Sequence, residues 1–161
     1  FLSGGYCKLP MDLSLHLSLD DIASGRAFDV SYLRDHQLKE FSPSFKIGLP
    51  EPLAPLMDKI TPTKPTWNNC NASGWTRDLI AVNGFNEQMQ YGGADRELGE
   101  RLANFGVTGR QIRHQAIVLH LDHKRGYKTP ETMAKNQAIR DEVIATRSVW
   151  CPHGIHKRPN P

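Results

Sequence analysis

Residues 67–102 read WNNCNASGWTRDLIAVNGFNEQMQYGGADRELGERL, and this stretch contains the most regular pattern of the chain. Leu98, Leu102 and Phe105 follow one another at the spacing of one face of a helix, and the next residue is a glycine, a typical helix stop. The pattern predicts a helix over residues 94–105 with a buried apolar face. A glycine-rich loop precedes this helix, so the chain is expected to turn there.

Strand patterns lie on either side of this region. Residues 116–121 read AIVLHL, an apolar run that is typical of a buried strand. Residues 1–10 read as two extended pieces joined by a turn at Gly4-Gly5. Proline at the first position predicts a last helix over residues 130–147. Together these patterns indicate an α/β fold with a mixed sheet flanked by helices.

Two shorter helices are predicted from their first residues. Thr76 is placed to cap a helix over residues 77–82, and Trp75 before it is expected to pack inward as a hydrophobic staple. Ser18 and Asp21 have the spacing of a capping box for another short helix. The many prolines between residues 42 and 66 predict a packed loop with one helical turn.

Composition limits the classes of protein. A length of 161 residues predicts one domain, which we place at residues 1–147, followed by a flexible tail over 148–161. The net charge of +3 is spread along the chain, which argues against a nucleic-acid-binding module. Three widely spaced cysteines disfavour a disulfide scaffold and favour a reducing compartment. No apolar run has the length of a membrane span.

Four linked motifs in the central region carry a family resemblance. They are Asn71-Ala72-Ser73, Val82-Asn83-Gly84-Phe85-Asn86-Glu87, Tyr91-Gly92-Gly93-Ala94-Asp95 and Gly99-Glu100-Arg101-Leu102. This set resembles the C-terminal half of the GT-A glycosyltransferases, in particular bacterial family 2 enzymes, and the resemblance extends from Phe1 to about Arg147. It implies an inverting transfer of a sugar from a nucleotide-sugar donor to a glycan acceptor.

The resemblance implies that Asp95 is the catalytic base, which takes a proton from the attacking acceptor hydroxyl. The start of a helix favours the ionised carboxylate that a base requires. A simple helix-capping role for Asp95 is the alternative. The residues expected to bind substrate are Trp67, Asn71, Tyr91, Gly92, Gly93 and Arg125. For Asn71, stabilisation of a turn is an equally open alternative.

The resemblance also implies a divalent metal ion, Mn²⁺ or Mg²⁺, which offsets charge on the leaving diphosphate. His120, at the end of the predicted strand, is the expected ligand, and His123 is the reserve. A hydrogen-bonded histidine near the edge of the core is the alternative. Arg125 is expected to contact the diphosphate, and a solvated loop is again the alternative.

Two departures from the family pattern favour a second hypothesis. Ala94 stands where the family has a glutamate. Glu97, one turn later, is expected to be a solvated surface residue, and partial replacement of that glutamate is the alternative. No D-x-D motif occurs, so the nucleotide-binding half is expected to lie before Phe1 or to have been lost. The second hypothesis is a non-catalytic sugar-binding or interaction domain, with a homodimer through an exposed sheet edge. For the enzyme, the resemblance implies a cytoplasmic location, with peripheral association at the inner face of the membrane.

Overall fold

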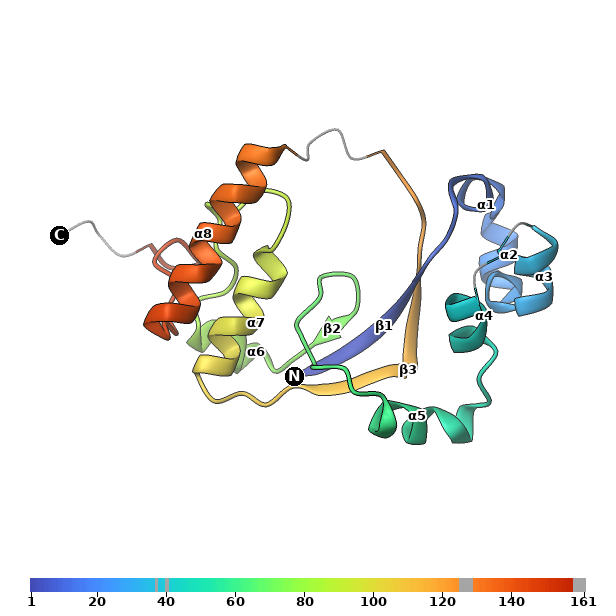
Figure 1. The fold of residues 1–161 in the computed structure, drawn as a ribbon, viewed down its shortest axis with the longest axis horizontal. Helices are drawn as coiled ribbons and strands as arrows, with labels where there is room; N and C mark the ends of the chain where they lie inside the picture. Colours follow the sequence, from blue (N-terminus) through green and yellow to red (C-terminus); the bar gives the residue numbers. More distant parts are fainter. Residues whose placement is uncertain (37, 40, 125–128, 158–161) are drawn as a thin grey trace. The chain divides into compact units, whose positions relative to one another are not determined.

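The structure is a computed structural model that describes residues 1–36, 38–39, 41–124 and 129–157. Its described part is α/β, with a small mixed sheet flanked by helices (Figure 1), as the sequence predicts. The strands are β1 (Leu2–Lys8), β2 (Ala72–Ser73) and β3 (Arg110–His120). The helices are α1 (Met11–His16), α2 (Leu19–Ala23), α3 (Val30–Asp35), α4 (Phe41–Ile47), α5 (Ala54–Ile60), α6 (Thr76–Ala81), α7 (Ala94–Asn104) and α8 (Pro130–Thr146), with 3-10 helices η1 (Arg26–Phe28) and η2 (Glu51–Leu53).

The chain divides into two compact units, and each is described here by itself. Unit 1 contains Phe1–Ser3, Lys64–Arg110 and the described residues after position 128. Unit 2 contains Gly4–Thr63 and Gln111–Lys124. The predicted single domain over residues 1–147 does not distinguish these units, because both are built from segments far apart in the sequence.

The sheet has the order β2-β1-β3, and β2 pairs with β1 antiparallel. At one end of β1 the N–H of Arg110 donates to the carbonyl of Phe1 (2.8 Å), and at the other the N–H of Leu9 donates to the carbonyl of His120 (2.9 Å). The two hydrogen bonds show that β1 and β3 run in the same direction. The strand predicted at 116–121 is confirmed as the second half of a longer β3.

Gly4 and Gly5 lie inside β1, so the predicted turn at these residues is wrong. A Cβ atom on Gly5 would lie 2.1 Å from the carbonyl oxygen of Arg113 on β3. Glycine is therefore required here because the backbones of the two strands approach closely, and not because the chain reverses.

The core of unit 1 lies against α7. Leu98 and Leu102, one turn apart on this helix, pack with Trp67 and Val82. The predicted helix is confirmed and ends one residue earlier than expected. Gly93, with φ of +91°, precedes it in the left-handed conformation that glycine tolerates best.

The last helix, α8, is also confirmed. The hydroxyl of Thr129 accepts a hydrogen bond from the N–H of Thr132 (3.2 Å), and Pro130 occupies the first helical position. The helix ends at Thr146, before Arg147 in the left-handed conformation (φ +53°).

Unit 2 carries most of the short helices around a leucine core. The buried core residues are Leu9, Leu13, Leu33 and Leu38. The predicted capping box at the start of α2 is confirmed: the N–H of Ser18 donates to the carboxylate of Asp21 (2.9 Å), and the N–H of Asp21 donates to the Ser18 hydroxyl (3.2 Å). Within the proline-rich region, the predicted helical turn is α5, and α4 is an additional helix that the sequence did not predict.

Residues 151–157, here called the C-terminal segment, pack against the core of unit 1. The N–H of Cys151, which is buried, donates to the carbonyl of Val82 (3.2 Å). The N–H of Ile155 donates to the carbonyl of Asn83 (3.0 Å). The sequence predicted a flexible tail here, and these contacts disagree with it. The last four residues of the predicted tail lie outside the described part.

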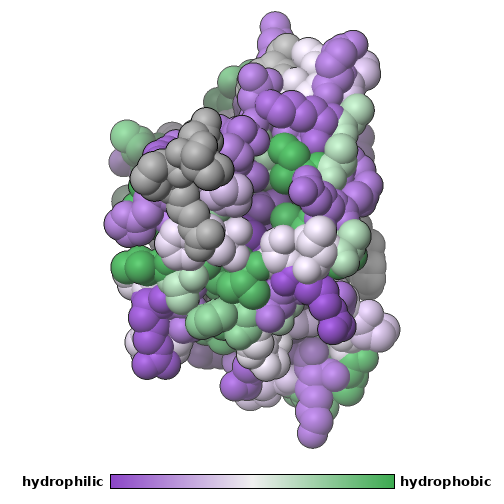
Figure 2. Space-filling model, turned by 90° about the vertical axis from the view of Figure 1, so that its left-hand side faces the viewer, coloured by the Kyte–Doolittle hydropathy of each residue, from purple (hydrophilic) through white to green (hydrophobic). Residues whose placement is uncertain are grey.

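On the face shown in Figure 2, hydrophobic residues (green) lie in small groups among hydrophilic ones (purple). The described helices include none with the length and apolar character that a membrane crossing requires.

Candidate functional site

Asp95 is the second residue of α7, where the sequence predicts it. Its side chain is partly exposed, and its Oδ1 accepts a hydrogen bond from the N–H of Arg96 (2.9 Å). Gly92 and Gly93 precede the helix with φ of +100° and +91°. The local geometry therefore agrees with the prediction of a carboxylate in the first helical turn behind two left-handed glycines.

The two glycines face α8. A Cβ atom on Gly92 would lie 2.5 Å from the sulfur of Met133, and one on Gly93 would lie 3.1 Å from Cδ of Arg140. Gly92 and Gly93 are among the residues that the sequence predicts to bind substrate, and that role stays a prediction. In the structure, the missing side chains let α8 pack against the loop.

Asn136 on α8 holds that loop. It is 1% exposed, and its Nδ2 lies 3.0 Å from the carbonyl oxygen of Tyr91 and 2.8 Å from that of Gly92. A buried amide is well placed to satisfy loop carbonyls that no strand or helix pairs. Asn136 is not among the residues predicted from the sequence, although Met133, Asn136 and Arg140 repeat at the three-to-four spacing of a buried helical face.

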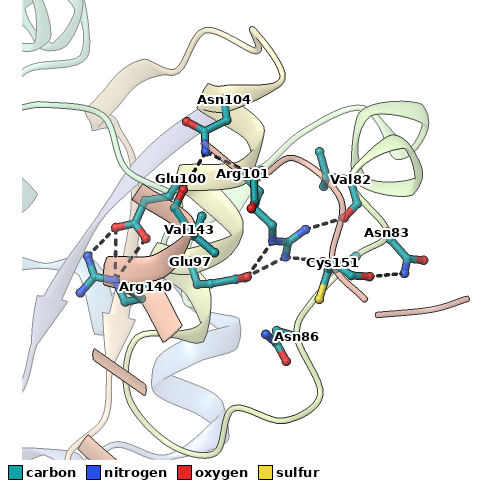
Figure 3. A network of polar contacts seen from close by, with 12 residues as sticks. Val82, Asn83, Asn86, Glu97, Glu100, Arg101, Asn104, Arg140, Val143 and Cys151 are labelled. Atoms are coloured by element: carbon teal, nitrogen blue, oxygen red, sulfur yellow. Dashed lines mark hydrogen bonds and ion pairs between the residues drawn. The ribbon is translucent and has the colours of Figure 1, made fainter. Parts of the chain in front are cut away.

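A buried ion pair joins two turns of α7 (Figure 3). Nε of Arg101 donates to Glu97 Oε1 (2.7 Å), and Nη2 donates to Oε2 (2.8 Å). The guanidinium also donates to the carbonyls of Val82 and, at 2.6 Å, Gly84. The prediction that Glu97 is a solvated surface residue is wrong, because its carboxylate is buried and is the counter-ion of Arg101.

Asn83 links this network to the C-terminal segment, as Figure 3 shows for Cys151. It is fully buried and has a φ of +64°, a conformation that asparagine tolerates. Its Nδ2 donates to the carbonyls of Cys151 (2.6 Å) and His156 (2.9 Å), and its Oδ1 accepts from the N–H of His156 (2.8 Å). Two of the four motifs behind the family resemblance thus have a structural role, since Arg101 and Asn83 hold unit 1 together.

Trp67, a predicted substrate-binding residue, is buried, and Trp75, predicted to pack inward, is exposed. Trp67 is 6% exposed, and its ring packs against that of Phe1, with centroids 5.6 Å apart. This burial leaves little of the Trp67 ring for stacking on a sugar. Trp75 is 72% exposed and lies beside the guanidinium of Arg77, so the prediction of a core staple is wrong.

Asn71 belongs to a tight turn near Asp95. Its N–H donates to the side-chain oxygen of Asn68 (2.8 Å), and the thiol of Cys70 donates to the same atom (3.1 Å). The pKa of the Cys70 thiol is raised, mainly by burial. A backbone hydrogen bond acts to lower this pKa, and the negative charge of Asp95 acts to raise it. The structure therefore places this turn and the Asp95 carboxylate close to each other. Tyr91 is exposed on the adjoining loop.

A pocket of about 630 Å³ lies along α7, where Arg96, Gly99 and Glu100 line it. Its lining includes Lys64, Arg96, Glu100 and Arg140, and the exposed edge of Trp67. Nη2 of Arg140 lies 2.5 Å from Glu100 Oε1, and this hydrogen bonding raises the pKa of Arg140. The charges of Arg140 and Glu100 neutralise each other, so Lys64 and Arg96 make the pocket basic.

The histidines expected to bind metal lie in unit 2. His120 is the last residue of β3, and its ring centroid lies 6.2 Å from that of Tyr6 and 5.7 Å from that of His123. Nδ1 of His123 lies 3.2 Å from the carbonyl oxygen of Lys124. Within the described ranges, no three His, Cys, Asp or Glu side chains gather in a metal-binding group. Arg125 lies outside the described residues.

Among the described residues, Asp95 and the substrate-binding candidates thus share unit 1, and the two histidines belong to unit 2. Comparison with known proteins gives no match, since no family model, curated protein or solved structure matches the chain.

Proposed function

We propose that the chain is the acceptor-side part of an inverting, metal-dependent glycosyltransferase of the GT-A fold. The observation that carries the proposal is the position of Asp95, whose partly exposed carboxylate lies in the first turn of α7 and whose charge acts on the Cys70 thiol in the Asn68–Asn71 turn. The motif resemblance of residues 67–102 supports the same assignment. In this proposal the donor is a nucleotide sugar and the acceptor is a glycan.

The geometry around Asp95 suits a general base. Asp95 lies in the first turn of α7, and the hydrogen bond from the N–H of Arg96 occupies its Oδ1. The second oxygen is available for the proton of an acceptor hydroxyl as that hydroxyl attacks the anomeric carbon. The loop before Asp95 is held by Asn136 on α8, which limits its motion.

The basic pocket beside Asp95 supports binding of a polar ligand at this end of unit 1. Arg96 is the residue next to Asp95 and lines the pocket together with Lys64. Charged donors suit the hydroxyls of a glycan and the oxygens of a phosphate.

The proposal includes a divalent ion, Mn²⁺ or Mg²⁺, with His120 as its protein ligand and His123 in reserve. Imidazole nitrogen is a suitable ligand for a transition metal ion, so His120 fits Mn²⁺ better than Mg²⁺. When bound, the ion would offset charge on the leaving diphosphate.

One observation favours the second candidate, a non-catalytic sugar-binding or interaction domain. Ala94, the first residue of α7, replaces the glutamate that the family resemblance leads us to expect next to Asp95. The exposed ring of Trp75 would offer such a domain a flat apolar surface for a sugar. A homodimer stays a prediction in either case, as do a cytoplasmic location and peripheral membrane association.

The experiment is a transfer assay on the protein that contains this chain, with a panel of nucleotide sugars, Mn²⁺ and glycan acceptors, and product detection by mass spectrometry. We expect Asp95→Asn to abolish transfer and to leave donor binding intact, and chelation of the metal to stop the reaction. Asp141→Asn, an exposed change on α8, is the matched control. Full transfer by Asp95→Asn would contradict the base assignment. Glycan binding without transfer of any donor would favour the second candidate.

A further inference from the structure

Unit 2 contains a pocket that the proposed transfer reaction does not use. Its volume is about 640 Å³, and its walls come from the end of α4, the η2–α5 region and the middle of β3. Ile47, Leu49, Pro52 and Ile117 give it a largely apolar lining. This size and lining are typical of sites for small organic molecules.

The ring of His114 lines this pocket and is held in a fixed orientation by Asp58. Oδ1 of Asp58 lies 2.8 Å from Nδ1 of His114 and accepts the backbone N–H of the same residue at 2.8 Å. Oδ2 accepts a hydrogen bond from Gln115 (2.8 Å). Both side chains of the pair are 5% exposed.

The charge on Asp58 decides which nitrogen of His114 is available. Burial acts to raise the pKa of Asp58, but the hydrogen bonds from Gln115 and His114 outweigh it, so the pKa is lowered. The ionised carboxylate accepts hydrogen bonds only, and Nδ1 of His114 is therefore the donor. Nε2 is the ring nitrogen left for a ligand: it accepts a hydrogen bond in the neutral ring and donates one when both nitrogens carry a proton.

Lys46 brings a positive charge to the same pocket. Burial lowers the pKa of Lys46, and the nearby charge of Arg113 lowers it further. Among the described residues no carboxylate forms an ion pair with Lys46, and Glu51, the acidic residue of the lining, is exposed. Nε of Arg113 is buried and has no hydrogen-bond partner within the described part. Within the described ranges, Lys46 in the pocket wall and its neighbour Arg113 have no carboxylate counter-ion, and such a pair of positive charges favours the binding of an anion at Lys46.

We propose that this pocket binds a small organic carboxylate together with a proton: the carboxylate accepts hydrogen bonds from Lys46 and from the protonated Nε2 of His114, and the apolar body lies against Ile47, Leu49 and Ile117. A carboxylate fits better than inorganic phosphate, because the wall is apolar and few donors converge on it. The site lies within unit 2 and does not include Asp95. Its test measures carboxylate binding, so the result does not depend on whether the chain transfers a sugar.

The experiment uses the full chain and two carboxylate probes, benzoate and hexanoate, with benzyl alcohol as the neutral analogue of benzoate. Long-range ¹H–¹⁵N spectra follow the ring nitrogens of His114 during each titration. We expect saturable binding of the carboxylates with a shift of the His114 Nε2 resonance, and no such shift with benzyl alcohol. Equal effects of benzoate and benzyl alcohol, or no saturable shift with either carboxylate, would overturn the proposal.

A substitution provides the second test. Lys46→Gln is expected to weaken benzoate binding at least about tenfold, which corresponds to about 1.4 kcal/mol. Lys59→Gln, an exposed lysine on α5, is the control and should leave binding unchanged. An equal loss in both variants, or no loss in Lys46→Gln, would remove Lys46 from the site. The His114 resonances of the unaltered chain remain a test if a variant fails to fold.

Discussion

The side-chain amide of Asn136 lies 2.8 Å from the carbonyl oxygen of Gly92, so one residue of α8 fixes the loop that leads into Asp95. Gly92 and Asn136 are 44 residues apart in the sequence. The position of the proposed base therefore depends on a helix that does not carry it.

Asn136→Ala should destabilise the fold. The loop carbonyls of Tyr91 and Gly92 would lose their buried donor, with a loss of about 1–3 kcal/mol in the free energy of unfolding. Chemical denaturation measures this loss. Gln137→Ala, the exposed neighbour on α8, is the control, and an equal effect in both variants would contradict a specific role for Asn136.

Arg101→Met should be more damaging, because it leaves the carboxylate of Glu97 buried without its counter-ion. The expected loss is about 3–5 kcal/mol in the free energy of unfolding. Glu97→Leu combined with Arg101→Met should recover part of it, since the unpaired charge is gone but the carbonyls of Val82 and Gly84 stay unsatisfied. A double variant as unstable as Arg101→Met would show that the charge is not the cause.

Gly92→Ala tests the packing of α8 against the loop. Gly106→Ala is a matched control, since both glycines have φ above +90° but a Cβ on Gly106 meets nothing within 4 Å. Gly106→Ala should cost about 1–2 kcal/mol for the left-handed backbone alone. Gly92→Ala should cost more because of Met133, and Met133→Ala in the same protein should relieve the difference. Equal melting temperatures for the two single variants would refute the packing explanation.

Asp21 should titrate abnormally. Hydrogen bonds from Ser18 lower its pKa to about 2. The ionised carboxylate therefore stabilises the fold above the unfolded-state pKa of about 3.9, and the contribution is lost as the pH falls through about 2. The ¹³C carboxyl resonance of Asp21 measures the titration, and Ser18→Ala should move its midpoint upward. An unchanged midpoint in Ser18→Ala would show that the capping box is not what lowers the pKa of Asp21.

Asn83→Gly isolates the side-chain bonds that hold the C-terminal segment. Glycine accepts the φ of +64° at this position, so the backbone conformation is kept while three hydrogen bonds are lost. Amide exchange at Ile155 and His156 should become faster in the variant. Unchanged protection at both amides would mean that other contacts hold the segment.

Sequence patterns predicted the elements whose structure depends on residues close together in the chain. The Ser18 capping box, α7 and α8 each follow from side chains within a few positions of one another, and all three are confirmed. Asp95 is placed correctly in the first turn of α7 for the same reason. Its chemical role is a prediction that geometry alone does not test.

Distant contacts explain the predictions that failed. Whether Trp67 or Trp75 is buried depends on Phe1 and on helix α7, which no local pattern around either tryptophan encodes. The sequence pattern around Glu97 is typical of a surface position. Glu97 is buried because Arg101, its counter-ion, is held by the carbonyls of Val82 and Gly84. The C-terminal segment is polar and proline-rich, yet its backbone groups form hydrogen bonds with the side chain of Asn83, which lies 68 residues before Cys151 in the sequence.

The parallel pairing of β1 with β3 has a consequence during protein synthesis. β3 leaves the ribosome about a hundred residues after β1, and until then β1 lacks the partner against which Gly5 fits. Pairing over such a sequence distance is slow to form because a long loop must close first. A nascent chain halted before residue 110 would thus hold an unpaired strand edge, the kind of surface that chaperones bind.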